Sequence, residues 1–334
     1  MNSAPLVSII TPSFNQAGFL EQTIRSVLAQ EGVHIEFMIV DGGSTDGSLE
    51  IIRSYSQQLA WWVSEPDNGQ AEAINKGLQR ASGDYVAWLN SDDLYLPEAV
   101  SAAVALLESN PNLGMVFGDA ITIDPQGRPL NRLSFGDWGL DELMGFRIIC
   151  QPAVFMRRPL LEKIGYLDPS YHYLLDHQLW LRIARAAPIK HATAIWAAAR
   201  QHPDAKNVAQ APGFGQEALR IRAWMETQPD LAALIARRKR AVDAGVHRLN
   251  ARYLLDGGLP APALRAYWQA LLAEPGFALK HWHRMLYAAL SLLGGNKLAG
   301  QNLARWYFRL RPDRRPDLSD LPALKSWPGL LLEG

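Results

Sequence analysis

The chain has 334 residues, with 33 Lys and Arg against 33 Asp and Glu, 48% hydrophobic residues and a single cysteine. This length excludes a small disulfide-stapled module, the hydrophobic content excludes a disordered chain, and one large domain or two ordinary domains are expected. A formal net charge of zero argues against a protein that mainly binds the phosphates of nucleic acid, so no nucleic-acid partner is expected. Cys150 can form no internal disulfide, which fits a reducing compartment.

The amino-terminal segment lacks a basic region, and its apolar run from Leu6 to Ile10 is too short for a signal peptide or a membrane span. We therefore expect the mature protein to start here and to be cytoplasmic. The longest other apolar run, Met285 to Leu293, is also too short to span a bilayer. It could lie on a membrane surface, so a peripheral location at the inner membrane face is included in the expectation.

Short apolar runs alternate with helical patterns in the first half of the chain. Strands are predicted at 6–11, 35–40 and 84–89, with helices at 20–28, from Ser48 onward and around 71–78. Further strands are predicted at 114–118 and 152–156. Because the runs are continuous, the strands are expected to be buried on both faces. Residues 1–205 are therefore predicted to form an α/β domain, with a mostly parallel sheet flanked by helices.

The second half, residues 206–334, has Ala, Leu, Arg and Trp at helical spacing and is predicted to be all-helical. Breaks at 257–258, 275–276 and 294–295 divide it, and helices around 250–273 and 276–293 are predicted to form a hairpin. The segment from Arg305 to Arg315 carries five arginines and three aromatic residues against one acid. This composition suits a membrane surface or, equally, a solvated helix face with its aromatic side chains packed inward.

Polar residues directly follow three of the predicted strands, at 12–15, 41–47 and 90–93. In open α/β sheets, ligands bind beyond the carboxyl ends of the strands, so these residues are expected to converge on one crevice. Each set also has a structural interpretation. Asn15 and residues 44–46 are suitable helix caps, and Asp92 or Asp93 is a suitable cap for a turn before Pro97.

Asp92 and Asp93 are adjacent acids at the end of a buried strand, where uncompensated carboxylates are costly. A divalent cation would relieve that cost. Oxygen ligands without neighbouring His or Cys suit Mg²⁺ or Mn²⁺, which commonly bind one or two carboxylates together with substrate phosphates. The implied substrate is a nucleotide diphosphate or triphosphate. The chain contains no P-loop motif, and 41–47 matches neither the dinucleotide-binding pattern nor a calcium loop.

Three segments, taken in order and at their spacing, resemble the inverting family 2 glycosyltransferases with the GT-A fold. They are VSIITPSFNQAGFLEQTIRSVLAQ, IEFMIVDGGSTDGSLEII and SEPDNGQAEAINKGLQRASGDYVAWLNSDD. The resemblance covers residues 6–120 closely. It extends less closely over 145–205, through GDAITID, QPAVFMRRPLLEKIGYLD and LLDHQLWLRIA. It implies a nucleotide-diphosphate sugar donor and a GT-A domain followed by a helical region.

The resemblance also assigns donor-binding residues. Pro12, Phe14 and Asn15 match the first nucleotide-contacting loop, Asp41 matches the acid that meets the base or ribose, and Lys76 lies where the diphosphate is expected. The D-x-D motif falls on Asn90, Ser91 and Asp92, followed by Asp93. Asn90 departs from the motif, because it replaces the first Asp. Ser91 and Asp92 are assigned to the donor, and both Asp92 and Asp93 remain candidate metal ligands.

Asp176 matches the catalytic base of the family, although its local sequence also suits a helix cap. A base is needed because a sugar hydroxyl attacks efficiently only when its proton is removed. His202 lies in a segment that resembles the one closing over the donor pyrophosphate, and Gln151 and Pro152 lie in a segment often used near the acceptor.

The expected activity is transfer of a sugar to an acceptor hydroxyl with inversion, dependent on Mg²⁺ or Mn²⁺. The expected acceptor is a glycan or lipid-linked glycan in cell-surface polysaccharide or lipopolysaccharide assembly. The main alternative is a non-catalytic nucleotide-sugar binding or scaffold protein, for which Asn90 is the best support. A nucleotidyltransferase also uses a metal and an α/β sheet, although nothing in the sequence particularly indicates it.

Overall fold

The computed structural model describes residues 5–202, 206, 210–292, 327, 328 and 330. These residues divide into two compact units, of which the first holds 5–139, 149–201 and the three near the carboxyl terminus. The second unit holds 140–148 and the described residues from 202 to 292. The predicted boundary between residues 205 and 206 stays a prediction. The grouping of 140–148 with the second unit was not indicated by the sequence pattern.

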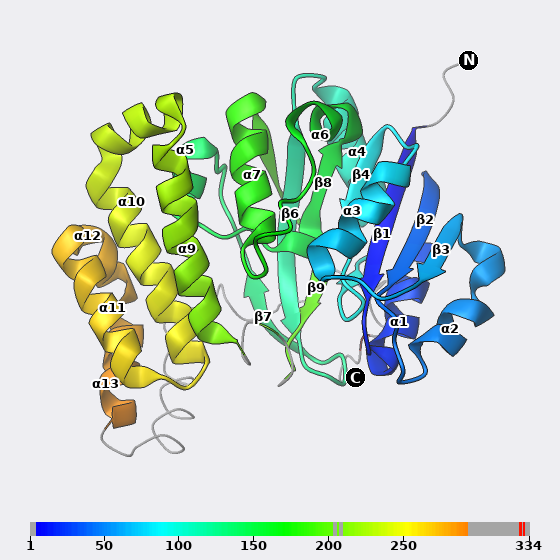
Figure 1. Ribbon diagram of the computed structural model, residues 1–334. Helices are drawn as coiled ribbons and strands as arrows, with labels where there is room; N and C mark the ends of the chain where they lie inside the picture. Colours follow the sequence, from blue (N-terminus) through cyan, green and yellow to red (C-terminus); the bar gives the residue numbers. More distant parts are fainter. Residues whose placement is uncertain (1–4, 203–205, 207–209, 293–326, 329, 331–334) are drawn as a thin grey trace. The chain divides into compact units, whose positions relative to one another are not determined.

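A sheet in the order β3-β2-β1-β4-β8-β6-β9-β5 forms the centre of the first unit, with β7 also paired to β6 (Figure 1). The strands are β1 (Leu6–Ser13), β2 (His34–Asp41), β3 (Trp61–Ser64), β4 (Tyr85–Trp88), β5 (Leu94–Tyr95), β6 (Met115–Ile123), β7 (Pro129–Leu133), β8 (Val154–Arg157) and β9 (Ile189–Arg200). The α/β class is thus confirmed. The predicted strands all occur, and 152–156 begins as a 3₁₀ turn, η2 (Gln151–Ala153), before β8.

The sheet is mixed in direction rather than mostly parallel. β3, β2, β1 and β4 are parallel neighbours, and β6 is parallel to β9. β8 lies antiparallel between β4 and β6, while β5 and β7 are antiparallel to β9 and β6. β6 therefore runs in the same direction as β4. The carboxyl ends of β1, β2, β4 and β6 all point to one edge of the sheet, and β8 starts from that edge.

Helices cover both faces of this sheet. They are α1 (Ala17–Leu28), α2 (Ser48–Ser54), α3 (Gln70–Arg80), α4 (Ala99–Ser109), α6 (Arg158–Ile164) and α7 (Leu175–Ala186), with a 3₁₀ turn η1 (Ser56–Gln58). Apolar residues of α1 and α4 pack in one core with alternate residues of β1, β2 and β4. On β1's other face, Gly77 of α3 lies so close to Ile10 that a β-carbon would be 2.6 Å from the Ile10 side chain. The continuous apolar runs are thus buried on both sides, as expected.

The second unit is helical, as the sequence predicted. It contains α5 (Leu140–Met144), α9 (Ala211–Glu226), α10 (Pro229–Asp256), α11 (Pro260–Ala273), α12 (Pro275–Ala278), the 3₁₀ turn η3 (Leu279–His281) and α13 (Trp282–Leu292). The predicted break at 257–258 is confirmed, so a single helix over 250–273 is wrong. Gly258 adopts φ +74°, which favours glycine, and Pro260 opens a new helix. The break at 294–295 and the segment from Arg305 to Arg315 lie outside the described residues.

Membrane-spanning helices were searched for within the part of the chain that the structure describes. None of its helices combines the length and the apolar character needed to cross a bilayer.

Candidate active site

The loops after β1 and β2 are joined at the carboxyl edge of the sheet. The Asn15 amide donates to Ser44 Oγ at 2.8 Å, and Asn15 Oδ1 accepts from the Thr45 amide at 2.9 Å. The first amide of α1, at Ala17, is capped by Asp46 Oδ2 at 2.9 Å. Asn15 therefore connects the two loops, and the capping of α1 comes from Asp46. Phe14 beside it is 60% exposed, which leaves its ring accessible to a ligand, while Pro12 is buried within β1.

Asp41 is fully buried at the end of β2 and organises the loop that follows. Its Oδ2 accepts from the amides of Gly43 and Ser44, at 3.1 and 2.9 Å, and from Ser64 Oγ at 2.7 Å. Its Oδ1 accepts from Ser44 Oγ at 2.5 Å. The carboxylate is thus satisfied from within the protein. Its contact with a base or ribose stays a prediction.

Gly42 is packed closely between an aromatic ring and a carboxylate. A β-carbon at Gly42 would lie 2.8 Å from Asp67 Oδ2 and 3.3 Å from Phe14 Cδ2. Only glycine fits between these two side chains without a shift. Asp67 was not among the predicted site residues, although it follows a strand, β3, in the manner of the other site residues. β3 was not predicted from the sequence, so Asp67 could not be identified as a polar residue that follows a strand.

The Asn90 side chain is the centre of a hydrogen-bond network at the end of β4. Its Oδ1 accepts from Gln70 Nε2 at 2.7 Å, at the start of α3. Its Nδ2 donates to Asp93 Oδ2 at 3.1 Å and to Gln151 Oε1 at 3.2 Å. Gln151 Nε2 in turn donates to the Trp88 carbonyl at 2.8 Å. An amide suits this position because it donates and accepts at once, which a carboxylate cannot do.

Asp92 and Asp93 differ sharply in their surroundings. Asp93 is buried; its Oδ1 accepts from the Arg200 backbone amide at 3.0 Å and its Oδ2 from Asn90. Burial raises the pKa of Asp93 well above its ordinary value, and the neighbouring Asp92 carboxylate raises it further. Asp92 is only partly buried, and Ser91, between Asn90 and Asp92, is buried.

A divalent cation fits the chemistry of this loop only if the substrate supplies further ligands. Among the described residues, no three His, Cys, Asp or Glu side chains are grouped so that they could hold a metal. Asp92 offers one carboxylate at the carboxyl edge, while both oxygens of Asp93 are engaged by protein donors. One carboxylate together with substrate phosphates is a normal arrangement for Mg²⁺. The residues present therefore fit Mg²⁺ or Mn²⁺ bound with a diphosphate.

Asp176 lies in the first turn of α7, and the topology places that turn at the carboxyl edge. The carboxyl end of α7 is at the opposite edge, because Pro188 just beyond it accepts from the Gly114 amide at 2.9 Å and Ile189 pairs with Met115 at the start of β6. Its amino terminus must therefore point to the edge where β4 and β6 end.

A stacked pair of tryptophans fixes α7 against β4 at the level of the site. The ring of Trp180, one helical turn after Asp176, stacks on Trp88 at a centroid distance of 5.2 Å. Trp88 lies two residues before Asn90. The Asp176 carboxylate thus lies at the same edge of the sheet as the Asn90–Asp93 loop. Its Oδ1 accepts from the His177 amide at 2.7 Å.

The loop before Asp176 is tied to neighbouring elements on two sides. The Asn75 side chain of α3 both donates to and accepts from the backbone of Leu167, at 2.9 and 3.0 Å. The Arg182 guanidinium of α7 donates to the carbonyls of residues 164, 165 and 166. These contacts fix the chain that leads into α7.

The remaining predicted residues differ in how far the structure connects them to the site. Gln151 is part of the Asn90 network, and Pro152 is buried beside it in η2. Lys76 forms ion pairs with Glu65 and Glu72, both at 3.1 Å, and these hydrogen bonds raise its pKa. Its role toward a diphosphate stays a prediction. His202 is buried and belongs to the second unit, and its place near a pyrophosphate also stays a prediction.

Comparisons with known proteins match this architecture. The family model described as glycosyl transferase family 2 matches residues 8–165. An uncharacterized glycosyltransferase of Mycobacterium tuberculosis is 33% identical over 191 residues, which cover 55% of this chain and 71% of that protein. A PGL/p-HBAD biosynthesis glycosyltransferase of Mycobacterium bovis is 32% identical over 184 residues, covering 54% of this chain and 70% of that protein.

Two solved structures share the fold at low sequence identity. The crystal structure of residues 1–349 of S. aureus TarS has a TM-score of 0.58 at 17% identity, and the match covers 85% of this chain and 87% of that chain. A mannosyltransferase from Pyrobaculum calidifontis, in complex with GDP-Man and Mn²⁺, has a TM-score of 0.58 at 20% identity and 88% coverage of both chains.

Proposed function

Because the chain belongs to glycosyltransferase family 2, we propose that it transfers a sugar from a nucleotide-diphosphate sugar to an acceptor hydroxyl with inversion. One observation carries the proposal. The topology brings three groups to the same edge of the sheet: the exposed Phe14 ring with the Asp67 carboxylate beside Gly42, the Asp92 carboxylate and the Asp176 carboxylate.

The donor nucleotide is assigned to the surface beside Gly42, at the Phe14 ring and the Asp67 carboxylate. A flat base can stack on the exposed Phe14 ring, and the Asp67 carboxylate can accept from its N–H groups. Support comes from TarS, whose structure has been solved with UDP-GlcNAc and with UDP, and from the mannosyltransferase with GDP-Man. The four bases differ in their hydrogen-bonding groups, so comparing the binding of a panel of nucleotides tests which base this chain prefers.

Asp92 is assigned as the ligand of Mg²⁺ or Mn²⁺, and Asp93 is assigned a structural role. Asp93 is less suited to a metal because both of its oxygens already accept hydrogen bonds from the protein. A bound cation supplies neutralisation of the charge that develops on the departing nucleoside diphosphate. The Mn²⁺ in the mannosyltransferase structure supports this assignment.

Asp176 is assigned as the general base. The acceptor oxygen forms a bond to the anomeric carbon as the bond from that carbon to the diphosphate oxygen breaks, and the acceptor proton passes to the Asp176 carboxylate. Attack from the face opposite the leaving group inverts the configuration. The base and the leaving-group stabiliser are separate groups on α7 and on the loop after β4.

The acceptor is proposed to be a glycan or lipid-linked glycan of the cell surface, with the reaction in the cytoplasm. The mycobacterial relative named for PGL/p-HBAD biosynthesis supports a lipid-linked acceptor. Peripheral membrane contact is proposed through exposed apolar residues of the second unit, such as Trp268, Leu272 and Trp282, which are 58%, 67% and 46% exposed. Failure of the protein to float with anionic liposomes at low salt would contradict that contact.

The scaffold alternative loses its main support in the structure. Asn90 was its best argument, because an amide in place of the first Asp suggested a degraded metal site. The Asn90 amide instead makes three hydrogen bonds to Gln70, Asp93 and Gln151, so its replacement of Asp has a structural reason.

The decisive experiment is a thermal-shift panel of UDP, GDP, dTDP and CDP, each with and without Mn²⁺. A nucleotide that binds only the folded protein raises the melting temperature by mass action. We expect one base to give the largest shift, with a Mn²⁺-dependent part that Asp92→Asn removes. Asp137→Asn, at an exposed acid paired with Lys190, is the matched control and should keep the full shift. A folded protein that responds to no nucleotide would refute the proposed donor.

A further inference from the structure

The carboxyl end of β9 reaches the loop that carries Asp92. Arg200, the last residue of β9, is 5% exposed, yet it carries a permanent charge. Its backbone amide donates to Asp93 Oδ1 at 3.0 Å, and its Nε donates to the Asp92 carbonyl oxygen at 2.9 Å. One residue thus holds both members of the acidic pair, by the main chain and by the side chain.

The rest of the guanidinium is anchored at three other places. Nη1 donates to the carbonyls of Asp124 and Pro125, at 3.1 and 2.9 Å, and Nη2 donates to Gln22 Oε1 of α1 at 2.7 Å. The guanidinium carbon lies 4.8 Å from the centre of the Phe19 ring. The acceptors of these guanidinium hydrogen bonds are carbonyl and amide oxygens, and the carboxylates of Asp93, Asp92 and Asp124 attract the charge as well.

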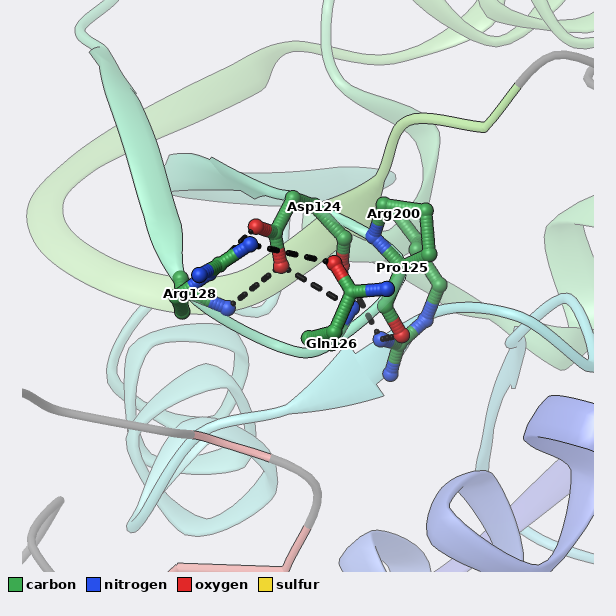
Figure 2. Close-up of polar contacts among 5 residues, drawn as sticks. All are labelled: Asp124, Pro125, Gln126, Arg128 and Arg200. Carbon is green, nitrogen blue, oxygen red and sulfur yellow. Dashed lines mark hydrogen bonds and ion pairs between the residues drawn. The ribbon is translucent and has the colours of Figure 1, made fainter.

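The turn that receives Nη1 is held by several internal hydrogen bonds (Figure 2). Asp124 Oδ1 accepts from the amides of Gln126 and Arg128, both at 2.9 Å, and Oδ2 accepts from Arg128 Nε at 2.7 Å. The Asp124 carbonyl accepts from the Gly127 amide at 2.9 Å as well as from Arg200. Arg200 therefore connects the acidic loop to a turn that is held by its own hydrogen bonds.

We propose that Arg200 is a positioning residue for the metal ligand: it fixes the Asp92 carbonyl, and so the direction in which the Asp92 carboxylate meets a donor-bound cation. This rests on the proposed function. Without the Nε bond, the peptide between Asp92 and Asp93 loses the donor that holds its carbonyl. Lysine cannot replace the arginine, because a single ammonium group cannot reach the Asp92 carbonyl, the carbonyls of the 124–125 turn and Gln22 Oε1 at the same time.

The test measures binding of the nucleoside diphosphate that gives the largest shift in the panel, by calorimetry, with and without Mn²⁺. Arg200→Lys should weaken binding in Mn²⁺ by at least about tenfold and change binding without Mn²⁺ by less than about twofold. Gln22→Leu, which removes only the Nη2 acceptor, should give a smaller loss in the same direction; it keeps the test available if Arg200→Lys does not fold. Arg53→Lys, at an exposed position in the last turn of α2, should behave as wild type.

The outcomes separate this inference from the proposed function. Wild-type protein that binds no nucleotide would refute the proposed function. Nucleotide binding that retains its full Mn²⁺ enhancement in Arg200→Lys would refute the positioning role alone. An equal loss with and without Mn²⁺ would show that Arg200 only stabilises the fold, and a wild-type affinity that Mn²⁺ does not change would also overturn the inference.

Discussion

Replacing Asn90 by Asp restores the strict D-x-D motif and is expected to damage the protein. The Asn90 Nδ2 group lies 3.1 Å from Asp93 Oδ2 and 3.2 Å from Gln151 Oε1. A carboxylate oxygen in its place would face two acceptors with no proton between them. The substitution converts two hydrogen bonds into two repulsive contacts, one of them between like charges.

The magnitude follows from these distances. Two full charges 3.1 Å apart repel by about 5 kcal/mol at an effective dielectric constant of about 20. One of the two carboxyls takes up a proton instead, which relieves part of this cost, since burial and Asp92 already raise the pKa of Asp93. Including the lost bond to Gln151, we expect a loss of stability of about 2 to 4 kcal/mol at pH 8.

The loss should depend on pH with a definite sign. A carboxyl whose pKa is raised in the folded state binds more protons folded than unfolded, so stability falls as pH rises from the ordinary carboxyl pKa through the raised one. Wild type has this trend through Asp93, and a second acid at position 90 should enlarge it. The loss in free energy of unfolding caused by Asn90→Asp should therefore be smallest near pH 4 and should reach its full size at pH 8.

Urea unfolding at pH 4.5 and pH 8, followed by tryptophan fluorescence, measures this deficit. The buried, stacked Trp88 and Trp180 lie in the unit concerned and report on its unfolding. Asn112→Asp, at an exposed position, is the control and should change stability by less than about 0.5 kcal/mol. If Asn90→Asp were as stable as wild type at pH 8, or bound a nucleotide more tightly in Mn²⁺, the structural role of Asn90 would be refuted.

Two further predictions concern the base and the loop before it. Asp176→Asn can still accept from the His177 amide, so nucleotide binding should stay within about twofold while turnover falls about 10²- to 10⁴-fold; normal turnover would show that Asp176 is not the base. Asn75→Ala removes both hydrogen bonds to Leu167 and should cost about 1 to 3 kcal/mol of stability in a urea titration, with lower turnover; an unchanged midpoint would show that the loop is held by other contacts.

The sequence predicts those strands best that are long, apolar and continuous. The runs at 6–11 and 35–40 are rich in β-branched and other apolar residues, and the structure buries them on both faces of the sheet. Their composition therefore suits the buried strands that they form. β9 (Ile189–Arg200) was not predicted, because five of its twelve residues are alanine, the strongest helix former. It is a strand because its backbone pairs with β6 on one side and with β5 on the other, which no local pattern reveals.

The placement of the site residues was predictable for the same topological reason. Parallel strands end at one edge, so polar residues that directly follow β1, β2 and β4 had to gather there. Asp67 was missed with β3, and Arg200 was missed with β9. A site residue is thus as predictable as the strand that carries it.

Chemical role is harder to predict than position, because it depends on partners distant in the sequence. Asn90 lies where the motif required, but its amide is matched to Gln70 and Gln151, which are 20 and 61 residues away. The same partners explain the difference between two adjacent acids. Asp93 is held by Asn90 and the Arg200 amide, so it can stabilise the loop, while Asp92 is only partly buried at the carboxyl edge of the sheet. A departure from a motif therefore carries little weight against activity until the partners of the replaced residue are known.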